Sequence, residues 1–165
     1  MPSLPHATIY TDGACIGNPG PGGYGVVLRS DRRRREASGG FSPTTNNRME
    51  IYAAIVGLRM LTKPTIVTLF SDSKYLVDAV NKGWLQRWHA NRWQRNKRKK
   101  LENVDLWKQL LPLLGKHQVT FHWVKGHAGD PENERCDRLA NNAAAQPGLP
   151  PDSGYQTSSP QSTMF

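Results

Sequence analysis

The stretch Ala7-Thr8-Ile9-Tyr10-Thr11-Asp12-Gly13-Ala14-Cys15 has the alternation of side chains typical of a β-strand, and it carries a single carboxylate, Asp12, close to its end. Burying an acid among such apolar neighbours costs free energy unless a cation compensates its charge. Three more isolated acids, Glu50, Asp72 and Asp137, occur later, each inside or at the end of an otherwise apolar segment. We therefore expect the fold to gather the four carboxylates around divalent metal ions.

Next to this strand the sequence predicts a small antiparallel unit. Residues 17–23 are rich in glycine and proline and predict a loop, which lacks the Lys and Ser/Thr ending of a nucleotide-binding P-loop. Residues 24–28 predict a second strand and residues 36–41 a third, separated by a polar tip at 30–35. Strands joined this briefly are expected to be antiparallel neighbours. The four arginines of the tip either contact phosphates or are simply solvated.

The second acid belongs to a predicted buried helix. Residues 44–47, Thr-Thr-Asn-Asn, offer several N-caps for a helix that reaches about Leu61. From Met49 onward this helix is apolar on nearly every side, which is typical of a helix inside the protein. Glu50 is its only acid. The alternative role for Glu50 is an interaction with the helix dipole, which contributes less than about 1 kcal/mol.

Asp72 follows the β-forming run 65–70, which is apolar enough for a central strand covered on both faces. The order strand, helix, strand implies a parallel crossover, and ligands of such sheets bind beyond the carboxyl ends of the parallel strands. Asp72 is expected at that position. It could also cap the short helix predicted at 74–80.

A further strand and two helices complete the pattern. Asn103 is expected to cap a helix over 104–114, and residues 118–124 predict a fifth strand. Asp130-Pro131 predicts the start of the last helix, with the acid as N-cap and the proline at the first helical position. Asp137 lies in this helix near the edge of its apolar stripe, and taken alone it would be a solvated surface acid.

The charge of the chain indicates a polyanionic partner. The formal net charge is +9 over 165 residues. No apolar run approaches a membrane span, and the N-terminus lacks the features of a signal peptide, so we expect nucleic acid, no membrane, and a cytoplasmic location. Cys15 and Cys136 form neither a CxxC motif nor a disulfide framework, and are expected to be reduced, buried thiols.

Basic and aromatic residues alternate in the segment 82–101, which contains no acid before Glu102. Phosphate contacts and stacking on bases or sugars require this combination. The alternatives are a solvated face and tryptophans that anchor a helix to the core. The basic residues are Lys82, Arg87, Arg92, Arg95, Lys97, Arg98, Lys99 and Lys100, and the tryptophans are Trp84, Trp88 and Trp93.

The predicted cluster of acids has a defined chemistry. Oxygen ligands without a His or Cys cluster favour Mg²⁺ or Mn²⁺ over Zn²⁺. Two such ions about 4 Å apart can activate a water and stabilise a leaving oxygen in phosphodiester cleavage. His127, in the glycine-flanked loop 125–129, could transfer a proton there, although a loop histidine is often only a surface residue.

With these residues identified, the sequence resembles bacterial type 1 ribonuclease H over about residues 7 to 144. The motifs that carry the resemblance, in order and spacing, are Tyr10-Thr11-Asp12-Gly13, residues 17–25, Thr44-Thr45-Asn46-Asn47-Arg48-Met49-Glu50, Ser71-Asp72-Ser73, residues 103–107, and Val124-Lys125-Gly126-His127-Ala128-Gly129 followed by Cys136-Asp137. The resemblance implies an α/β ribonuclease H-like fold, a five-stranded mixed sheet with helices on both faces. It also implies an endonuclease that hydrolyses the RNA strand of RNA–DNA hybrids with two Mg²⁺ ions, which Mn²⁺ can replace, and leaves 5′-phosphate and 3′-hydroxyl ends.

The same resemblance assigns roles to individual residues. It implies metal ligation and catalysis by Asp12, Glu50, Asp72 and Asp137, and proton transfer by His127. The residues that it implies in substrate binding are Asn18, Asn46 and Asn47 near RNA 2′-hydroxyls, Thr45 and Asn103 at a phosphate of the DNA strand, and Trp84 and Trp88 with the basic protrusion at the DNA channel. The 2′-hydroxyl is the group that distinguishes RNA from DNA.

Three positions depart from the family pattern. Pro43 stands where relatives commonly have a basic residue, so the phosphate pocket is expected to be weaker. Lys74 stands where relatives often have a neutral amide, and Asp130 adds an acid near His127.

We expect a catalytic domain over residues 1–145, including the protrusion at 82–101, and a monomeric protein. Residues 146–165 are rich in Pro, Ser and Gln and predict a flexible tail, with Tyr155 as one candidate for a contact to the domain. Two alternatives stay open: an enzyme of the same fold that acts on DNA, and a hybrid-binding module without catalysis. The asparagine-lined loop argues against the first, and the complete set of four acids argues against the second.

Overall fold

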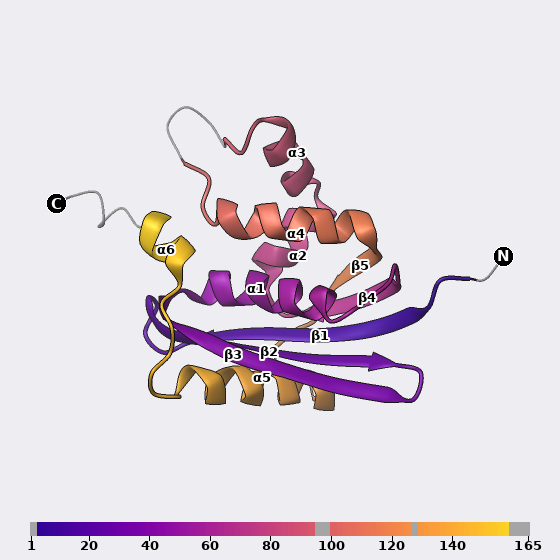
Figure 1. Cartoon of the computed structure of the whole chain (residues 1–165), viewed down its shortest axis with the longest axis horizontal. Coiled ribbons are helices and arrows are strands. Elements are labelled where there is room, and N and C mark those ends of the chain that lie inside the picture. Colours follow the sequence, from indigo (N-terminus) through magenta and orange to yellow (C-terminus); the bar gives the residue numbers. More distant parts are fainter. Residues whose placement is uncertain (1–2, 95–99, 127–128, 159–165) are drawn as a thin grey trace.

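The computed structural model describes residues 3–94, 100–126 and 129–158. At its centre lies a five-stranded mixed sheet with the order β3-β2-β1-β4-β5 (Figure 1). The strands β1 to β3 are antiparallel neighbours, and β4 and β5 run parallel to β1. This confirms the predicted sheet. Their bounds are β1 His6–Cys15, β2 Gly20–Ser30, β3 Arg33–Thr44, β4 Ile66–Ser71 and β5 Gln118–Trp123.

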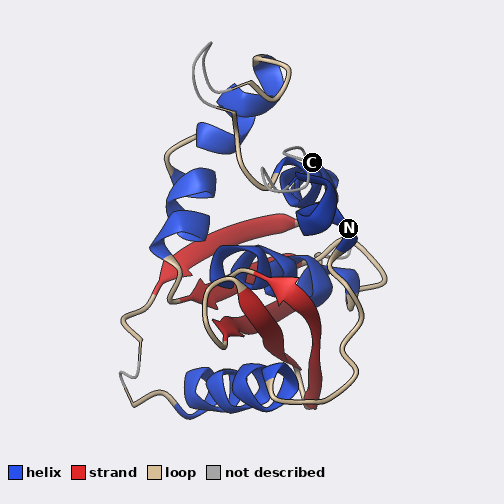
Figure 2. Cartoon of the chain, turned by 90° about the vertical axis from the view of Figure 1, so that its left-hand side faces the viewer, coloured by secondary structure: helices blue, strands red, loops and turns tan. Residues whose placement is uncertain are grey.

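Helices cover both faces of the sheet (Figures 1 and 2). On one face α1, Asn46–Arg59, packs on β1 and β2, and on the other α5, Pro131–Ala144, packs on β1, β2 and β3. The prediction of a buried first helix is confirmed, because α1 contributes Ile51, Ile55 and Leu58 to the main core cluster. The remaining helices are α2 Lys74–Asn81, α3 Trp84–Ala90, α4 Val104–Lys116 and α6 Ser153–Ser158.

The glycine-rich residues 20–23 belong to β2 and not to a loop, so the predicted loop boundary is wrong there. The reason is the close approach of α5. A Cβ atom at Gly23 would collide with the backbone oxygen of Ala140, and one at Gly25 with that of Cys136. Glycine in a strand can mark a point where another backbone lies against it, as Gly23 and Gly25 do against α5.

The third strand is also longer than predicted, since β3 spans Arg33–Thr44. It pairs with β2 along nearly its whole length, with a register shift between Gly20 and Gly22. The arginine-rich tip is therefore mostly strand. Arg34 forms ion pairs with Glu36 and with Glu132 of α5, which links the hairpin to that helix.

Part of the predicted tail, residues 150–155, packs against the domain. The chain leaves α5 on one face of the sheet and reaches α6 on the α1 side (Figure 1). The backbone N–H of Ser42 donates to the oxygen of Pro150 at 2.9 Å, and Asp152 is buried. The Pro- and Ser-rich composition did not indicate this packing. The packing depends on one acid, Asp152, which forms an ion pair with the buried Arg48 of the domain. Residues 159–165 lie outside the described residues.

A buried histidine provides a stability prediction. The Nδ1 atom of His117 accepts a hydrogen bond from the backbone N–H of Thr65 at 3.1 Å. Burial lowers the pKa of His117, and the charge of Lys116 acts in the same direction. Folding thus favours the neutral ring, so its contribution to stability is complete above the unfolded pKa of about 6.5 and is lost as the pH falls below it.

We expect His117→Asn, whose side-chain oxygen can accept the same bond without titrating, to reduce this loss. Urea unfolding of both proteins at about pH 7.5 and about pH 5.5 measures it. An equal loss of unfolding free energy on acidification in both proteins would contradict the prediction.

Candidate active site

Three of the four predicted acids meet in the structure. Asp12, Glu50 and Asp72 each offer one carboxylate oxygen, and these oxygens lie within 4.8 Å of one another. Asp12 and Glu50 are only 8% and 4% exposed. The expectation that distant acids of the sequence gather at one place therefore holds for these three.

Backbone geometry brings them together. The parallel register pairs Thr11 of β1 with Ser71 of β4, so the next residues, Asp12 and Asp72, emerge side by side. Glu50 arrives from the first turns of α1 because β1 has a glycine at residue 13. A Cβ atom on Gly13 would lie 2.6 Å from the backbone nitrogen of Glu50, so only glycine allows the helix to approach so closely.

The alternative roles considered for these acids are met by other residues. Ser73, not Asp72, caps α2 by accepting the N–H of Leu76 at 3.2 Å. Thr45 caps α1. Asp72 is therefore not the cap of α2, and Glu50 lies beyond the first turn of α1, where the interaction with the helix dipole is weak.

The electrostatics of the group favour a cation. Burial, with a further contribution from the charge of Asp72, raises the pKa of Asp12 to about 8, and burial followed by the charges of Asp12 and Asp72 raises the pKa of Glu50. The Oε1 atom of Glu50 is buried and has no hydrogen-bond partner among the described residues. Hard carboxylate oxygens that repel one another, one of them without a hydrogen-bond donor in the described part of the chain, are suitable ligands for a divalent metal ion. The three carboxylates therefore fit a divalent metal ion.

The fourth acid, Asp137, lies in α5, outside the three-carboxylate group. It lines the same pocket as Asp12 and Asp72, and its charge also raises the pKa of Asp12. Its Oδ1 atom accepts a hydrogen bond from the side chain of Asn141 at 3.1 Å. The pocket is lined by Thr11, Asp12, Asp72, Val124, Lys125, Gly126, Asn133, Glu134 and Asp137.

Two charged residues of this lining were not predicted from the sequence. Glu134 precedes Asp137 by three positions, a spacing that puts both on one face of a helix and could have indicated it. Lys125 comes from the loop after β5. A Cβ atom at Gly126 would be 3.1 Å from Oδ2 of Asp72, so this loop runs directly beside the acids. His127 itself lies outside the described residues.

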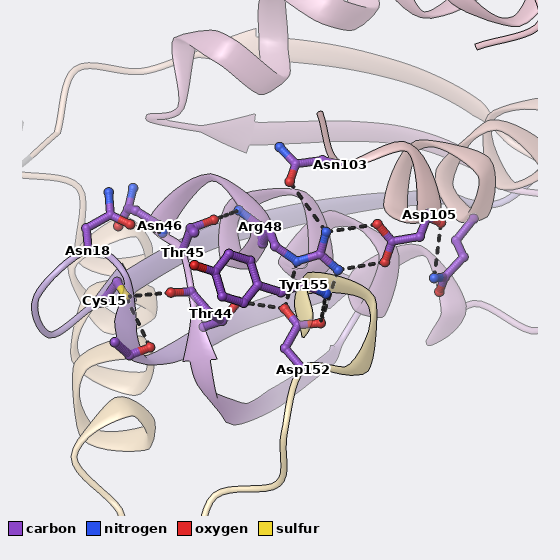
Figure 3. A network of polar contacts seen from close by, with 12 residues as sticks. Cys15, Asn18, Thr44, Thr45, Asn46, Arg48, Asn103, Asp105, Asp152 and Tyr155 are labelled. Carbon is purple, nitrogen blue, oxygen red and sulfur yellow. Dashed lines mark hydrogen bonds and ion pairs between the residues drawn. The ribbon is translucent and has the colours of Figure 1, made fainter. Parts of the chain in front are cut away.

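The polar residues predicted for substrate binding cluster near the start of α1 (Figure 3). The Oδ1 atom of Asn18 accepts the backbone N–H of Asn46 at 3.1 Å, and the next residue, Asn47, is exposed. Thr45 accepts the N–H of Arg48 at 3.2 Å. Asn103 occupies the N-cap position of α4, but its side chain makes no capping hydrogen bond, which corrects the prediction that it caps this helix.

The tryptophans of the basic segment are partly structural. Trp88 packs on the buried Trp107, with ring centroids 5.5 Å apart, and Trp84 lies 6.2 Å from Trp88. They anchor α3, which projects beyond α4 on the side away from α5 (Figures 1 and 2). The exposed basic residues described in this segment are Lys82, Arg87, Arg92 and Lys100, whereas Arg95, Lys97, Arg98 and Lys99 lie outside the described residues.

Within the described residues, no helix is both long and apolar enough to cross a bilayer.

Comparisons with known proteins agree with this geometry. The RNase H family model matches residues 5–145. The chain is 62% identical to a ribonuclease H of Trichodesmium erythraeum, over 90% of this chain and 95% of that protein, and 60% identical to a ribonuclease HI of Synechocystis, over 85% and 89%.

Solved structures show the same fold. The type 1 enzyme LC9-RNase H1, which has the type 2 active-site motif, superposes with a TM-score of 0.77 at 32% identity, over 87% of this chain and 74% of that one. LC11-RNase H1, crystallised with an RNA/DNA hybrid, superposes with a TM-score of 0.62 at 26% identity, over 84% and 96%. Matching motifs, fold, carboxylate group and relatives together show that this chain belongs to the ribonuclease H family.

Proposed function

We propose that this protein is an endonuclease that hydrolyses the RNA strand of RNA–DNA hybrids and leaves 5′-phosphate and 3′-hydroxyl ends. The observation that carries the proposal is the meeting of Asp12, Glu50 and Asp72 in a chain of this family. The hybrid bound to LC11-RNase H1 supports the substrate.

The acids account for the chemistry. We infer that Asp12, Glu50, Asp72 and Asp137 hold two Mg²⁺ ions when the hybrid is bound, and that Mn²⁺ can replace them. Such ions supply an activated water and charge neutralisation at the leaving oxygen. The chain itself fixes the carboxylates before substrate arrives: Asp12 accepts the N–H of Gly13 at 2.8 Å, and the surrounding core restricts Glu50. No side-chain nucleophile is required.

His127 is proposed to move a proton at the leaving oxygen. Supporting this role, the neighbouring Gly126 lies against Asp72, so the loop that carries His127 starts at the acids. Glycines at 126 and 129 flank the histidine, and Gly129 has a positive φ of 85°.

Substrate recognition is proposed to use two surfaces. Asn18, Asn46 and Asn47 would contact RNA 2′-hydroxyls in the minor groove, and Thr45 with Asn103 a phosphate of the DNA strand. On the second surface Trp84, Trp88 and the protrusion would hold the DNA strand. The protrusion residues in this proposal are Arg87, Arg92, Arg95, Lys97, Arg98, Lys99 and Lys100.

A digestion assay tests the function. End-labelled hybrid, duplex DNA and duplex RNA are incubated with the protein and Mg²⁺, and the products are sized. We expect internal cuts in the RNA of the hybrid alone. Cutting of duplex DNA would instead support a DNA enzyme of the same fold, and tight hybrid binding without cuts would support a binding module.

We also propose that the protein acts as a monomer in the cytoplasm, where reducing conditions suit its free Cys15 and Cys136. Sedimentation equilibrium at assay concentration tests the monomer. A mass of twice the 18.5 kDa chain would contradict it.

Replacing Lys97, Arg98, Lys99 and Lys100 by Ala is expected to weaken hybrid binding and to reduce its salt dependence. The plot of the logarithm of the binding constant against the logarithm of the salt concentration has a negative slope. Each phosphate that the variant no longer neutralises should reduce the magnitude of this slope by about 0.9 or less. Turnover at saturating substrate should persist. The measurement is hybrid affinity in Ca²⁺ at several salt concentrations.

A matched control replaces four exposed basic residues, Arg32, Arg33, Lys63 and Lys116, that lie at the opposite ends of the strands from the acids. This variant has the same net charge, so it separates contact from overall charge. Equal salt slopes in the two variants would mean that residues 97–100 do not touch the hybrid.

A further inference from the structure

Arg48 is a buried cation that joins three segments of the chain (Figure 3). Its side chain is 1% exposed, although it starts in the first turn of α1. Nη1 and Nη2 donate to the carboxylate of Asp105 in α4, at 2.8 and 2.6 Å. Nε and Nη2 donate to the carboxylate of Asp152 in the C-terminal segment, at 2.7 and 3.0 Å. Two carboxylates thus neutralise Arg48 and enclose it, so its guanidinium is not available to substrate.

The C-terminal segment, residues 150–155, is built to fit this site. Asp152 also accepts the hydroxyl of Thr44 at 2.6 Å. Gly154 lies so close to the Arg48–Asp105 pair that a Cβ atom would collide with Oδ2 of Asp105 and lie 2.6 Å from Nη2 of Arg48. Only glycine at 154 therefore lets the segment dock.

Asn103 is held by the same arginine. Its backbone is left-handed, with a φ of 63°, and its side chain does not cap α4. The Oδ1 atom instead accepts from Nη1 of Arg48 at 3.4 Å, and Nδ2 donates to the hydroxyl of Tyr75 at 3.2 Å. An asparagine cap typically contributes about 1 kcal/mol, so a side chain turned away from that position is under another constraint.

Thr45 and Asn103, the two residues proposed to hold a DNA-strand phosphate, therefore both contact Arg48. Thr45 does so through the backbone N–H of Arg48, and Asn103 through the guanidinium. We propose that the C-terminal segment positions this pair: Asp152 and Gly154 fix Arg48, and Arg48 fixes Asn103, so that docking of the segment increases affinity for the hybrid. This inference rests on the proposed function.

The direction of the effect separates positioning from simple electrostatics. Asp152 and Asp105 put two negative charges against the one positive charge of Arg48, which contacts both Thr45 and Asn103. If only charge mattered, removal of Asp152 would strengthen phosphate binding. Positioning predicts weaker binding, because Arg48 and Asn103 lose their fixed geometry.

The experiment uses Gly154→Ala and Asp152→Ala in the full-length chain, each alone and combined with Asn103→Ala. Gly115→Ala is the matched control, since nothing lies within 4 Å of a Cβ atom there. We measure KM and kcat on a hybrid substrate, hybrid affinity in Ca²⁺, and urea stability to keep all assays well below unfolding. Two different variants are used so that one that fails to fold does not decide the result.

We expect each tail variant to raise KM about tenfold, the equivalent of one lost hydrogen bond to a charged group, with kcat within about twofold. In the Asn103→Ala background the tail variants should add less than about twofold, because residues that act through one another are not additive.

Two failures are distinguishable. If Asn103→Ala leaves KM unchanged, the proposed phosphate contact is wrong. If Asn103→Ala raises KM but the tail variants leave it unchanged, lower it, or add their full effect in the double variants, then the segment does not position Asn103, and the proposed function stands without it.

Discussion

Asp12→Asn is expected to reduce hybrid cleavage by about 10³-fold or more, the scale on which loss of a preorganised electrostatic group acts. Asparagine keeps the shape and one oxygen of Asp12 but removes the negative charge that attracts a divalent ion to this site. Asp12 lies within 4.8 Å of both Glu50 and Asp72, so its loss affects the shared site. Initial rates on an end-labelled hybrid measure the effect, and hybrid affinity in Ca²⁺ should stay nearly unchanged.

The same variant, Asp12→Asn, is expected to lose cleavage activity without losing stability. Burial and the charge of Asp72 raise the pKa of Asp12 to about 8 in the absence of metal. A carboxyl with a raised native pKa destabilises the fold progressively as the pH rises from its unfolded value toward 8. Metal-free Asp12→Asn should therefore be at least as stable as the parent at neutral pH.

Asp31→Asn at the exposed hairpin tip is the control, because it removes one charge without touching the site. Near-normal turnover of Asp12→Asn would overturn the assignment of the metal site. Loss of turnover together with loss of stability would indicate a structural role for Asp12 instead.

Arg48→Leu is expected to lower the free energy of unfolding by about 3 to 5 kcal/mol, because removal of one partner leaves buried charges without compensation. Asp152 and Asp105 would face each other across the lost guanidinium, and the hydroxyl of Thr44 alone would not neutralise Asp152. Urea unfolding followed by circular dichroism at neutral pH measures the change.

The effect should diminish in acid. Burial acts to raise the pKa of Asp152, but hydrogen bonds from Arg48 and Thr44 outweigh it and lower the pKa. A carboxyl with a lowered pKa contributes stability above its unfolded pKa, and the contribution disappears as the pH falls through the native value. The difference between parent and Arg48→Leu should therefore narrow toward low pH.

Arg33→Leu, on the exposed part of the hairpin, serves as the control for loss of one arginine and should change stability by less than about 0.5 kcal/mol. A similarly small change in Arg48→Leu at neutral pH would show that the ion pairs contribute little to folding.

Local patterns were sufficient for most of the fold. The alternation around Asp12, the apolar helix after Thr45 and the β-forming run before Asp72 each depend on neighbouring residues, and β1, α1 and β4 follow them. The parallel crossover then required Asp12 and Asp72 to emerge at the same end of the sheet. Glu50 joined them because Gly13 permits a close approach of α1.

Where prediction failed, the deciding contact lies far away in the chain. Residues 20–23 have a loop composition, yet the backbone of α5 lies directly on Gly23 and favours glycine in a strand. Asn103 has the sequence of a cap, but Arg48 and Tyr75 hold its side chain away from α4.

Periodicity and composition are properties of short stretches, so they were sufficient to predict most of the strands and helices, the excess of positive charge and the four isolated acids. Local patterns did not predict that Asp137 stands apart from the other three acids or that the C-terminal segment docks on Arg48. The physical reason is that a buried charge is stable only beside its partner, and Asp152 is separated from Arg48 by 104 positions. Local sequence patterns therefore do not predict this pair, and the two residues meet only in the folded chain.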